Sequence, residues 1–396
     1  MNLQRRIKKH LIARTHTCFA VTGPGLEDLC QRELSAPPLA LPDPRIMPGG
    51  VAFQGRLHDL YGANLHLRTA TRILLRLDRL HALTFQELET RAARIPWELY
   101  LPWGNAPRIQ VTLHKCRLYH SGAVGQRIAA AIRTRWRKLD SSGPERQPEP
   151  GPQVIFVRGL ADRFILSLDS SGDPLYLRGL KTQGGRAPLR ETLAAAILMR
   201  AGYRPGMVLL DPMAGTGTFS LEAALLAAGL PPGWQRRFPF REWPAFQSGR
   251  WRHLRRQAAE ARVPPPARPA IVALDADEPT CKALDACLQQ NSLTSWVTVA
   301  RGDCLQVTPR EVAQFTGLSA PGLVALNPPY GLRLGDPAAS LALYQALGKH
   351  LQQHFRAWRL ALVIPPQVDL RTFPIAGSVY PLSHGGLALK LLVARI

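Results

Sequence analysis

The sequence of 396 residues lacks several features that mark large protein classes. It has no Cys-x-x-Cys pair and no Cys/His spacing typical of zinc sites, so we expect neither a metal centre nor a disulfide framework. Its six cysteines are instead predicted to be buried thiols in a reducing compartment, the cytoplasm: Cys18, Cys30, Cys116, Cys281, Cys287 and Cys304. It also has no apolar run of membrane-spanning length, which predicts a soluble protein with no membrane partner. Nothing in the sequence indicates an oligomeric state.

Acidic residues are scarce relative to basic ones. The chain has 50 Lys and Arg against 28 Asp and Glu, which gives a formal net charge of +22. A positive field of this size attracts polyanions, because each neutralised phosphate releases condensed counterions. The charge therefore predicts a nucleic-acid partner, although a generally Arg-rich proteome would produce part of the same excess.

The first 17 residues form a basic N-terminal extension without acidic residues. The extension lacks the apolar core and the small-residue cleavage site of a secretory signal. A mitochondrial presequence is one interpretation, since such peptides are basic and poor in acid. We favour the other, a flexible basic arm.

Residues 18–170 show an irregular alternation of strand and helix patterns, typical of an α+β region. We expect strands over 19–22, 51–53, 109–113, 154–158 and 164–168, helices over 26–34, 59–77 and 125–136, and an exposed loop over 140–152. Arg68, Arg72 and Arg76 recur four apart within 59–77. They should share one helix face, either as a solvated surface or as part of an RNA-facing one.

After residue 175 the alternation becomes regular, which predicts an α/β domain with a parallel sheet covered on both faces. We expect strands over 207–211, 270–275, 296–300, 323–326 and 359–364, and helices over 219–230, 279–291 and 341–355. Residues 229–269 are crowded with Pro, Trp and Arg. This segment is predicted to be an insertion before the second strand.

A glycine-rich turn follows the first of these strands, in the segment Asp211-Pro212-Met213-Ala214-Gly215-Thr216-Gly217-Thr218. Glycine lets the backbone approach a ligand closely at a helix N-terminus. The turn lacks the third glycine of a dinucleotide fingerprint and the Gly-Lys-Ser/Thr of a phosphate loop, which argues against a hydride-transferring oxidoreductase and against an ATPase. An acidic residue just before the glycines is typical of methyltransferases that use S-adenosyl-L-methionine. We therefore predict that Asp211, Gly215, Thr216, Gly217 and Thr218 bind this cofactor; the alternative is a tight strand–helix connection.

The next two strands also end in aspartate. A carboxylate at the carboxyl end of a parallel strand can accept both ribose hydroxyls of a cofactor, and we assign this role to Asp275. Asp277 is expected to cap the following helix. Asp303, after the third strand, is predicted to accept the adenine amine. Helix capping is the alternative for each aspartate taken alone.

The most specific motif is Asn327-Pro328-Pro329-Tyr330, directly after an apolar strand. An exocyclic amine of a base is a poor nucleophile because its lone pair is delocalised into the ring. The side-chain oxygen of Asn327 and the backbone carbonyl of Pro328 can together accept both amine hydrogens, which favours in-line attack on a sulfonium methyl. Tyr330 offers a flat face for a flipped base. We predict these three as catalytic residues; a plain Asn-Pro turn is the alternative.

Several segments together resemble the THUMP-domain RNA methyltransferases, and within them the guanine-N2 half of the bacterial 23S ribosomal RNA methyltransferase. The segments are 177–179 and 187–197 leading into 211–218, the tetrapeptide 327–330, and the opening segments 19–27 and 49–53. The resemblance implies a ferredoxin-like region over 18–64, an RNA-binding THUMP domain over 65–170, and a Rossmann-like methyltransferase domain over 175–396 with its insertion at 229–269. Two departures stand out, the extra residues 1–17 and the lack of the second methyltransferase domain that some fused relatives carry.

The resemblance implies methylation of guanine N2 in 23S ribosomal RNA, with structured RNA as partner. Other members of the family act on transfer RNA, which stays an alternative substrate. Adenine-N6 methylation of nucleic acid, including DNA, is a second alternative, disfavoured by the region that resembles a THUMP domain. A third is an RNA-binding assembly factor without catalysis, which the full set of motifs disfavours.

Overall fold

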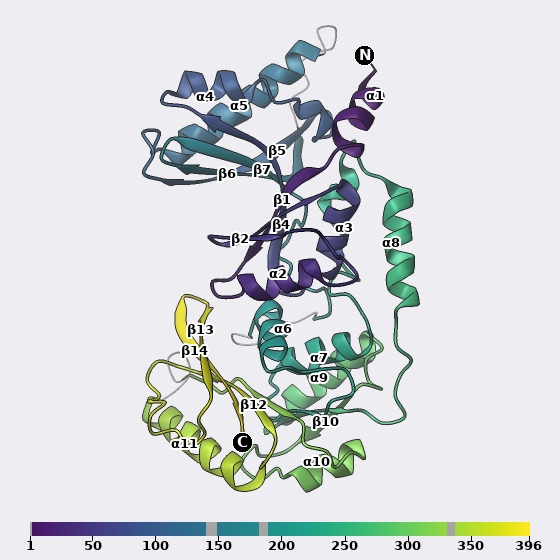
Figure 1. Cartoon of the computed structure of the whole chain (residues 1–396), viewed down its shortest axis with the longest axis vertical. Coiled ribbons are helices and arrows are strands. Elements are labelled where there is room, and N and C mark those ends of the chain that lie inside the picture. Colours follow the sequence, from purple (N-terminus) through teal and green to yellow (C-terminus); the bar gives the residue numbers. More distant parts are fainter. Residues whose placement is uncertain (1, 140–148, 182–188, 331–336) are drawn as a thin grey trace. The chain divides into compact units, whose positions relative to one another are not determined.

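The computed structural model describes residues 2–139, 149–181, 189–330 and 337–396 (Figure 1). The chain divides into two compact units. Unit 1 contains Met1–Thr22, Cys30–Leu175 and Arg236–Arg255, and unit 2 contains Gly23–Leu29, Tyr176–Gln235 and Arg256–Ile396. Each unit is built around a seven-stranded sheet. The chain therefore passes between the units several times.

The sheet of unit 1 has the order β2-β3-β1-β4-β7-β6-β5. Its strands are β1 (His16–Thr22), β2 (Arg45–Met47), β3 (Gly50–Gly55), β4 (Ala70–His81), β5 (Asn105–His114), β6 (Glu149–Leu160) and β7 (Arg163–Asp169). Its helices are α1 (Leu3–Ile7), α3 (Leu57–His66), α4 (Phe85–Ala92), α5 (Ser121–Leu139) and the C-terminal part of α2 (Glu27–Ser35). Only β5 and β6 pair in parallel, and α5 is their crossover, as a parallel pair requires.

The sheet of unit 2 has the order β10-β9-β8-β11-β12-β14-β13, in which the first five strands are parallel. They are β8 (Leu209–Asp211), β9 (Ile271–Asp275), β10 (Val297–Arg301), β11 (Leu323–Leu326) and β12 (Arg359–Ile364), followed by the antiparallel β13 (Ser378–His384) and β14 (Leu387–Arg395). The helices are α6 (Glu191–Arg200), α7 (Thr218–Ala227), α9 (Glu278–Gln290), α10 (Pro309–Thr316) and α11 (Pro337–His354). This arrangement confirms the predicted α/β fold with a Rossmann-like sheet.

Alternate residues of the parallel strands point to opposite faces, and both faces are covered. Leu209 and Ala325 belong to one buried apolar cluster, whereas Leu210 and Val324 belong to another. Because successive side chains in a strand point to opposite faces, an apolar residue at every position means burial on both sides. This explains why the strands of unit 2 are continuous apolar runs in the sequence.

Part of the segment predicted as an insertion completes the core of unit 1. It contains α8 (Ser248–Glu260), and its residues 236–255 are assigned to unit 1. Phe240 stacks on Tyr61 of α3 with ring centroids 4.5 Å apart, and Trp251 meets Phe240 edge-on at 5.4 Å. The indole of Trp243 donates to the side-chain oxygen of Gln153 at 2.8 Å. The aromatic residues that crowd this segment therefore contact residues at least 90 positions earlier in the chain.

The predicted helix over 59–77 is wrong in its second half. Helix α3 ends at His66, and Ala70–His81 is strand β4 at the centre of the sheet. Arg72 and Arg76 therefore share a strand face. The guanidinium of Arg76 lies 4.4 Å from the ring centre of Phe19, and Arg72 pairs with buried Asp169. Two of the three arginines expected on one helix face thus pack within the sheet.

Residues 2–17 do not form the flexible arm that we expected. Leu3–Ile7 is helical, a π-helix follows over Lys8–Ile12, and Ile7 and Leu11 are buried. Arg6 lies 2.6 Å from the carboxylate of Glu98, which also forms a two-pronged pair with Arg135. Apolar burial and this charge network fix the segment to unit 1.

The predicted loop over 140–152 is wrong at its C-terminal end, since β6 already begins at Glu149; residues 140–148 lie outside the described part of the chain. All six cysteines are free thiols, three of them buried and three partly exposed. Among the described residues, no helix is long and apolar enough to cross a membrane. In the same part of the chain, no group of three or more His, Cys, Asp and Glu could hold a metal ion.

Candidate active site

Strands β8 and β11 are neighbours at the centre of the unit 2 sheet, and the chain order reverses between them. From β8 the chain moves outward to β9 and β10, and it then returns to β11 on the other side of β8. A reversal of this kind opens a crevice at the carboxyl ends of the strands, where ligands bind in such sheets. The turn after β8 and the tetrapeptide after β11 both lie at these ends. The topology therefore places the two predicted motifs side by side.

The glycine-rich turn depends on glycine at two positions. Gly215 has φ +52° and Gly217 has φ +71°, conformations that residues with a Cβ rarely adopt. At Gly217 a Cβ would also overlap the side chain of Leu284. Among the described residues other than its chain neighbours, none has an atom within 4 Å of the place that a Cβ on Gly215 would take. Gly217 is therefore needed for packing of the turn, whereas Gly215 leaves room for a ligand to approach the backbone.

Asp211 lies beneath this turn rather than on its surface. Its side chain is buried, and the carboxylate accepts hydrogen bonds from the backbone amide (3.3 Å) and hydroxyl (2.8 Å) of Ser220 in the first turn of α7. Burial, with a smaller contribution from the negative charge of Asp275, raises the pKa of Asp211 to about 7, although the hydrogen bonds from Ser220 lower it. We propose that Asp211 supports the cofactor site through the shape of the turn.

Asp275 links the end of β9 to the glycine turn. One carboxylate oxygen accepts the backbone amide of Gly215 at 2.8 Å, and the other accepts the amide of Asp277 at 3.0 Å. Asp277 itself is the N-cap of α9 and accepts the amide of Thr280, which confirms the predicted capping role. Asp275 is thus held beside the turn in one orientation, with its remaining lone pairs able to accept ribose hydroxyls.

Asp303 lies two residues beyond the end of β10. Its carboxylate accepts a hydrogen bond from the backbone amide of Leu305 at 2.9 Å, and the residue is exposed. The neighbouring thiol of Cys304 has its pKa raised to about 11, mainly by burial and then by the charge of Asp303. The third predicted aspartate thus lies at the same sheet edge as Asp275, one strand further out.

Asn327 and Tyr330 contact each other at the end of β11. The Tyr330 hydroxyl donates a hydrogen bond to the Asn327 side-chain oxygen, and its ring packs against the apolar cluster on one face of the sheet. Burial raises the pKa of Tyr330 far above its usual range, so the phenol stays protonated. Pro328 between them is buried. The oxygen that we predict to accept a substrate amine therefore already accepts a hydrogen bond.

Lys181 also reaches the glycine turn, and sequence analysis did not identify it. Its ammonium lies 3.2 Å from the Thr216 hydroxyl, 2.8 Å from the Thr218 hydroxyl and 3.2 Å from the Glu191 carboxylate. The lysine and glutamate side chains are each only 15% exposed. No motif or spacing marks this lysine, because its two threonine partners in the turn lie 35 and 37 positions away in the sequence.

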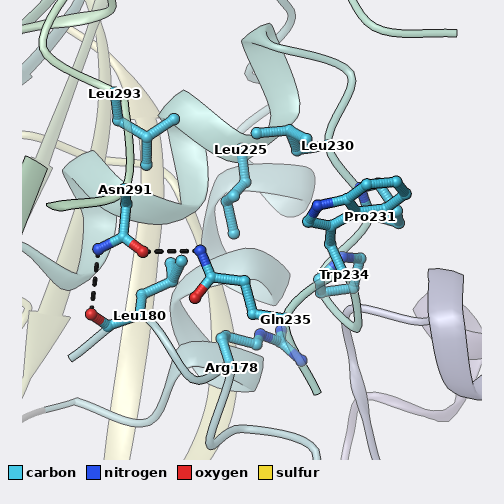
Figure 2. A pocket seen from close by; sticks show the side chains of 10 residues that line it. Arg178, Leu180, Leu225, Leu230, Pro231, Trp234, Gln235, Asn291 and Leu293 are labelled. Atoms are coloured by element: carbon cyan, nitrogen blue, oxygen red, sulfur yellow. Dashed lines mark hydrogen bonds between the residues drawn. The ribbon is translucent and has the colours of Figure 1, made fainter. Parts of the chain in front are cut away.

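The segment that ends in Lys181 is fixed at two points. Arg178 forms a buried ion pair with Glu222 of α7 at 2.9 Å. The backbone carbonyl of Leu180 accepts a hydrogen bond from the side-chain amide of Asn291 at 3.1 Å. The side-chain oxygen of Asn291 in turn accepts one from the side-chain amide of Gln235 at 2.7 Å. Figure 2 shows Arg178, Gln235 and Asn291 beside a small pocket lined mainly by leucine, proline and tryptophan. Because a broken buried ion pair is costly, these contacts hold the backbone leading into Lys181.

Two family models match the chain. The RMKL-like methyltransferase domain matches residues 178–373, and the RlmL ferredoxin-like domain matches residues 17–74. A ribosomal RNA large subunit methyltransferase K/L of Methylococcus capsulatus is 34% identical over 399 residues, which covers 96% of this chain and 51% of that protein. The chain spans about half the length of the K/L relatives that it matches. A putative RNA methyltransferase of Synechocystis, slr0064, is 31% identical, over 96% of this chain and 97% of that protein.

Solved structures resemble the chain along nearly its whole length. SMU.472, a putative methyltransferase complexed with SAH, has a TM-score of 0.85 at 26% identity and covers 96% of this chain and 98% of its own. A predicted N6-adenine-specific DNA methylase from Listeria monocytogenes also has a TM-score of 0.85, at 25% identity, over 100% of this chain and 98% of its own. These likenesses extend to both units, because each covers almost all of this chain.

Proposed function

We propose a reaction for this chain, which belongs to the family of RMKL-like methyltransferases. The chain transfers the methyl group of S-adenosylmethionine to the exocyclic N2 amine of a guanine in 23S ribosomal RNA, in the cytoplasm. The observation that carries the proposal is the position of Asn327 directly after β11, the strand that pairs with β8, which leads into the glycine turn. This places an amine acceptor beside the expected cofactor site.

The residues at the sheet edge fit S-adenosylmethionine. Gly215 leaves its backbone approachable, and Asp275 offers free acceptor capacity for ribose hydroxyls. Asp303 follows the neighbouring strand β10 and is proposed to accept the adenine amine. When bound, this cofactor supplies a methyl group that a sulfonium makes electrophilic. The complex of SMU.472 with SAH, the demethylated product, supports this choice of cofactor.

On the substrate side, the chain provides hydrogen-bond acceptors and a ring. The Asn327 side-chain oxygen and the Pro328 carbonyl accept the two amine hydrogens, which directs the nitrogen lone pair at the methyl group. Tyr330 stacks on the flipped base. As the carbon–nitrogen bond forms, the sulfonium carbon–sulfur bond breaks, and the amine proton passes to water or a backbone carbonyl. The protonated Tyr330 phenol and Asn327 do not act as bases.

Unit 1 carries a basic groove that fits an RNA backbone. Helices α4 and α5 enclose a groove of about 730 Å³, and Arg94, Arg127 and Lys138 are among the side chains that line it. Glu89 lies in the same groove and pairs with Arg127 at 3.0 Å, which leaves Arg94 and Lys138 as its main phosphate-binding candidates. Such contacts supply affinity without reading sequence. The groove supports an RNA-binding role for the region 65–170, which we propose is a THUMP domain.

A methyl-transfer assay with three substrates tests the proposal. The chain is incubated with radiolabelled S-adenosylmethionine and with unmodified 23S ribosomal RNA, transfer RNA or duplex DNA, and the modified nucleosides are identified by mass spectrometry. We expect N2-methylguanosine in 23S ribosomal RNA. Label mainly in transfer RNA, or N6-methyladenine in any substrate, would replace the proposed substrate with one of the alternatives. Cofactor binding without label in any of the three would instead support an assembly factor.

A further inference from the structure

Lys181 contacts the glycine turn, and the proposed reaction assigns this lysine no role. An ammonium group has three hydrogen-bond donors and no acceptor. In this structure all three have partners, namely the hydroxyls of Thr216 and Thr218 and the carboxylate of Glu191. Lys181 is therefore fully engaged and has no N–H left to bind a ligand directly.

The effect of Lys181 on the two threonines follows from the chemistry of a hydroxyl. A threonine hydroxyl has one donor and two acceptor sites. When its oxygen accepts from an ammonium, its own proton must donate elsewhere, and the positive charge makes it a stronger donor. Thr216 is half-buried within the turn, and Thr218 is the first residue of α7. Both hydroxyls are thus set to donate to an acceptor at the turn.

That acceptor should be anionic. The positive end of the α7 dipole lies at Thr218, and the Lys181 ammonium adds a charge of the same sign. The carboxylate of Glu191, the first residue of α6, offsets the Lys181 charge only from the side of that helix. Gly215, the residue before Thr216, donates its backbone amide to Asp275, a carboxylate suited to hydroxyl groups. The turn therefore has a carboxylate beside Gly215 that suits ribose hydroxyls, and two hydroxyls at Thr216 and Thr218 that suit an anion.

We propose that Lys181 is a positioning residue that directs the Thr216 and Thr218 hydroxyls at the carboxylate of the methionine moiety of S-adenosylmethionine. This inference rests on the proposed function, because it concerns the same cofactor. The carboxylate is the only anionic group of that molecule, whereas its sulfonium and amine are positive. The contacts that hold Arg178 and Leu180 fix the backbone before Lys181, so the ammonium is in place before the cofactor binds.

Binding of two ligands that differ only in this carboxylate tests the inference. The ligands are S-adenosylhomocysteine and its decarboxylated form, and their Kd values are measured by calorimetry on the full chain. The wild type should bind the first roughly tenfold more tightly, the usual effect of hydrogen bonds to a charged group. In Lys181→Met the preference should fall to about twofold or less, since the hydroxyls lose their orientation. Thr216→Val should also lower the preference for S-adenosylhomocysteine over its decarboxylated form.

The control is Lys282→Met, which removes an exposed lysine paired with Glu278 in the same unit and should keep the wild-type preference. A Lys181→Met variant that keeps the preference, or that binds both ligands more weakly by the same factor, would overturn the inference and show that the role of Lys181 is purely structural. If Lys181→Met does not fold, the ratio of the two Kd values measured for Thr216→Val tests the inference instead. A wild type that binds neither ligand would remove the proposed function itself, a result distinct from a preserved preference.

Discussion

The Tyr330 hydroxyl donates a hydrogen bond to the side-chain oxygen of Asn327 three residues earlier. An amide oxygen has two lone pairs, so this bond occupies half of the acceptor capacity that we assign to the substrate amine. The base must therefore share Asn327 with Tyr330 or displace the phenol as it stacks. The roles of the ring and of the hydroxyl can be separated by substitution.

Tyr330→Phe removes the hydroxyl and keeps the ring, whereas Tyr330→Ala removes both. We expect the phenylalanine variant to keep kcat/KM within about threefold, because stacking is retained and Asn327 gains a free lone pair. The alanine variant should lose roughly tenfold or more, the usual loss when one stacked base loses its aromatic partner. Steady-state methylation of RNA measures both. Equal losses in the two variants would show that the hydroxyl, and not the ring, is the functional part.

Asn327→Ala removes the amine acceptor without changing the sheet. We expect kcat to fall about 100-fold or more, the typical result of deleting one well-placed transition-state hydrogen bond. The Kd for S-adenosylhomocysteine should stay within about twofold, because the cofactor contacts lie on other strands. Single-turnover methylation and calorimetry on the same preparation provide the two values. Unchanged turnover would contradict the assigned role.

Asp211→Asn should change how stability depends on pH. Burial raises the pKa of Asp211 to about 7 in the folded chain from its ordinary value of 3.8. Between these values the folded state binds more protons than the unfolded state, so this group adds stability as the pH falls from 8 to 5. Asparagine does not titrate. The Tm of the variant minus that of the wild type should therefore be more positive at pH 8 than at pH 5.

An exposed aspartate provides the control for this pH experiment. The pKa of Asp369 is lowered by hydrogen bonds from Arg371, so it stays ionised across pH 5 to 8. Asp369→Asn should therefore shift Tm by a similar amount at both ends of the range. Thermal unfolding followed by circular dichroism is sufficient for both variants. If Asp211→Asn behaved like Asp369→Asn, the buried carboxylate would not titrate in this range.

The basic groove of unit 1 predicts a salt effect on RNA binding. Arg94→Ala and Lys138→Ala each remove a candidate phosphate contact from the groove. Each should weaken RNA binding and reduce the slope of log K against log salt by about 0.7 to 1. Filter binding at several salt concentrations measures the slope. Arg371→Ala, an exposed arginine of unit 2, is the matched control and should leave the slope unchanged if the groove holds the RNA.

Much of unit 2 could be predicted from the sequence, because its buried parallel strands are apolar runs. The bounds of β11 and β12 match the predicted ranges 323–326 and 359–364. The site motifs follow from the same pattern, since they are local to strand ends. Lys181 could not be found in this way: it reaches the turn only through the tertiary fold, and no local spacing encodes that contact.

The errors in unit 1 have a different physical cause. A spacing of four residues fits one face of a helix, but four is also a multiple of the strand period of two. Arg72 and Arg76 therefore satisfy both patterns, and the sheet decides between them through Phe19 and Asp169 on other strands. In the same way, the order of residues 2–17 depends on Glu98, a partner that no local pattern reveals.

The packing of Phe240 and Trp251 on Tyr61 affects the order in which a nascent chain can mature. Residues 236–255 are synthesised after the first strand and first crossover helix of the second sheet, yet they complete the core of unit 1. While a ribosome translates the N-terminal half, the aromatic face around Tyr61 therefore has no cover. A fragment that stops near residue 175 would keep that face open, so separating the chain there would yield an N-terminal piece prone to aggregation.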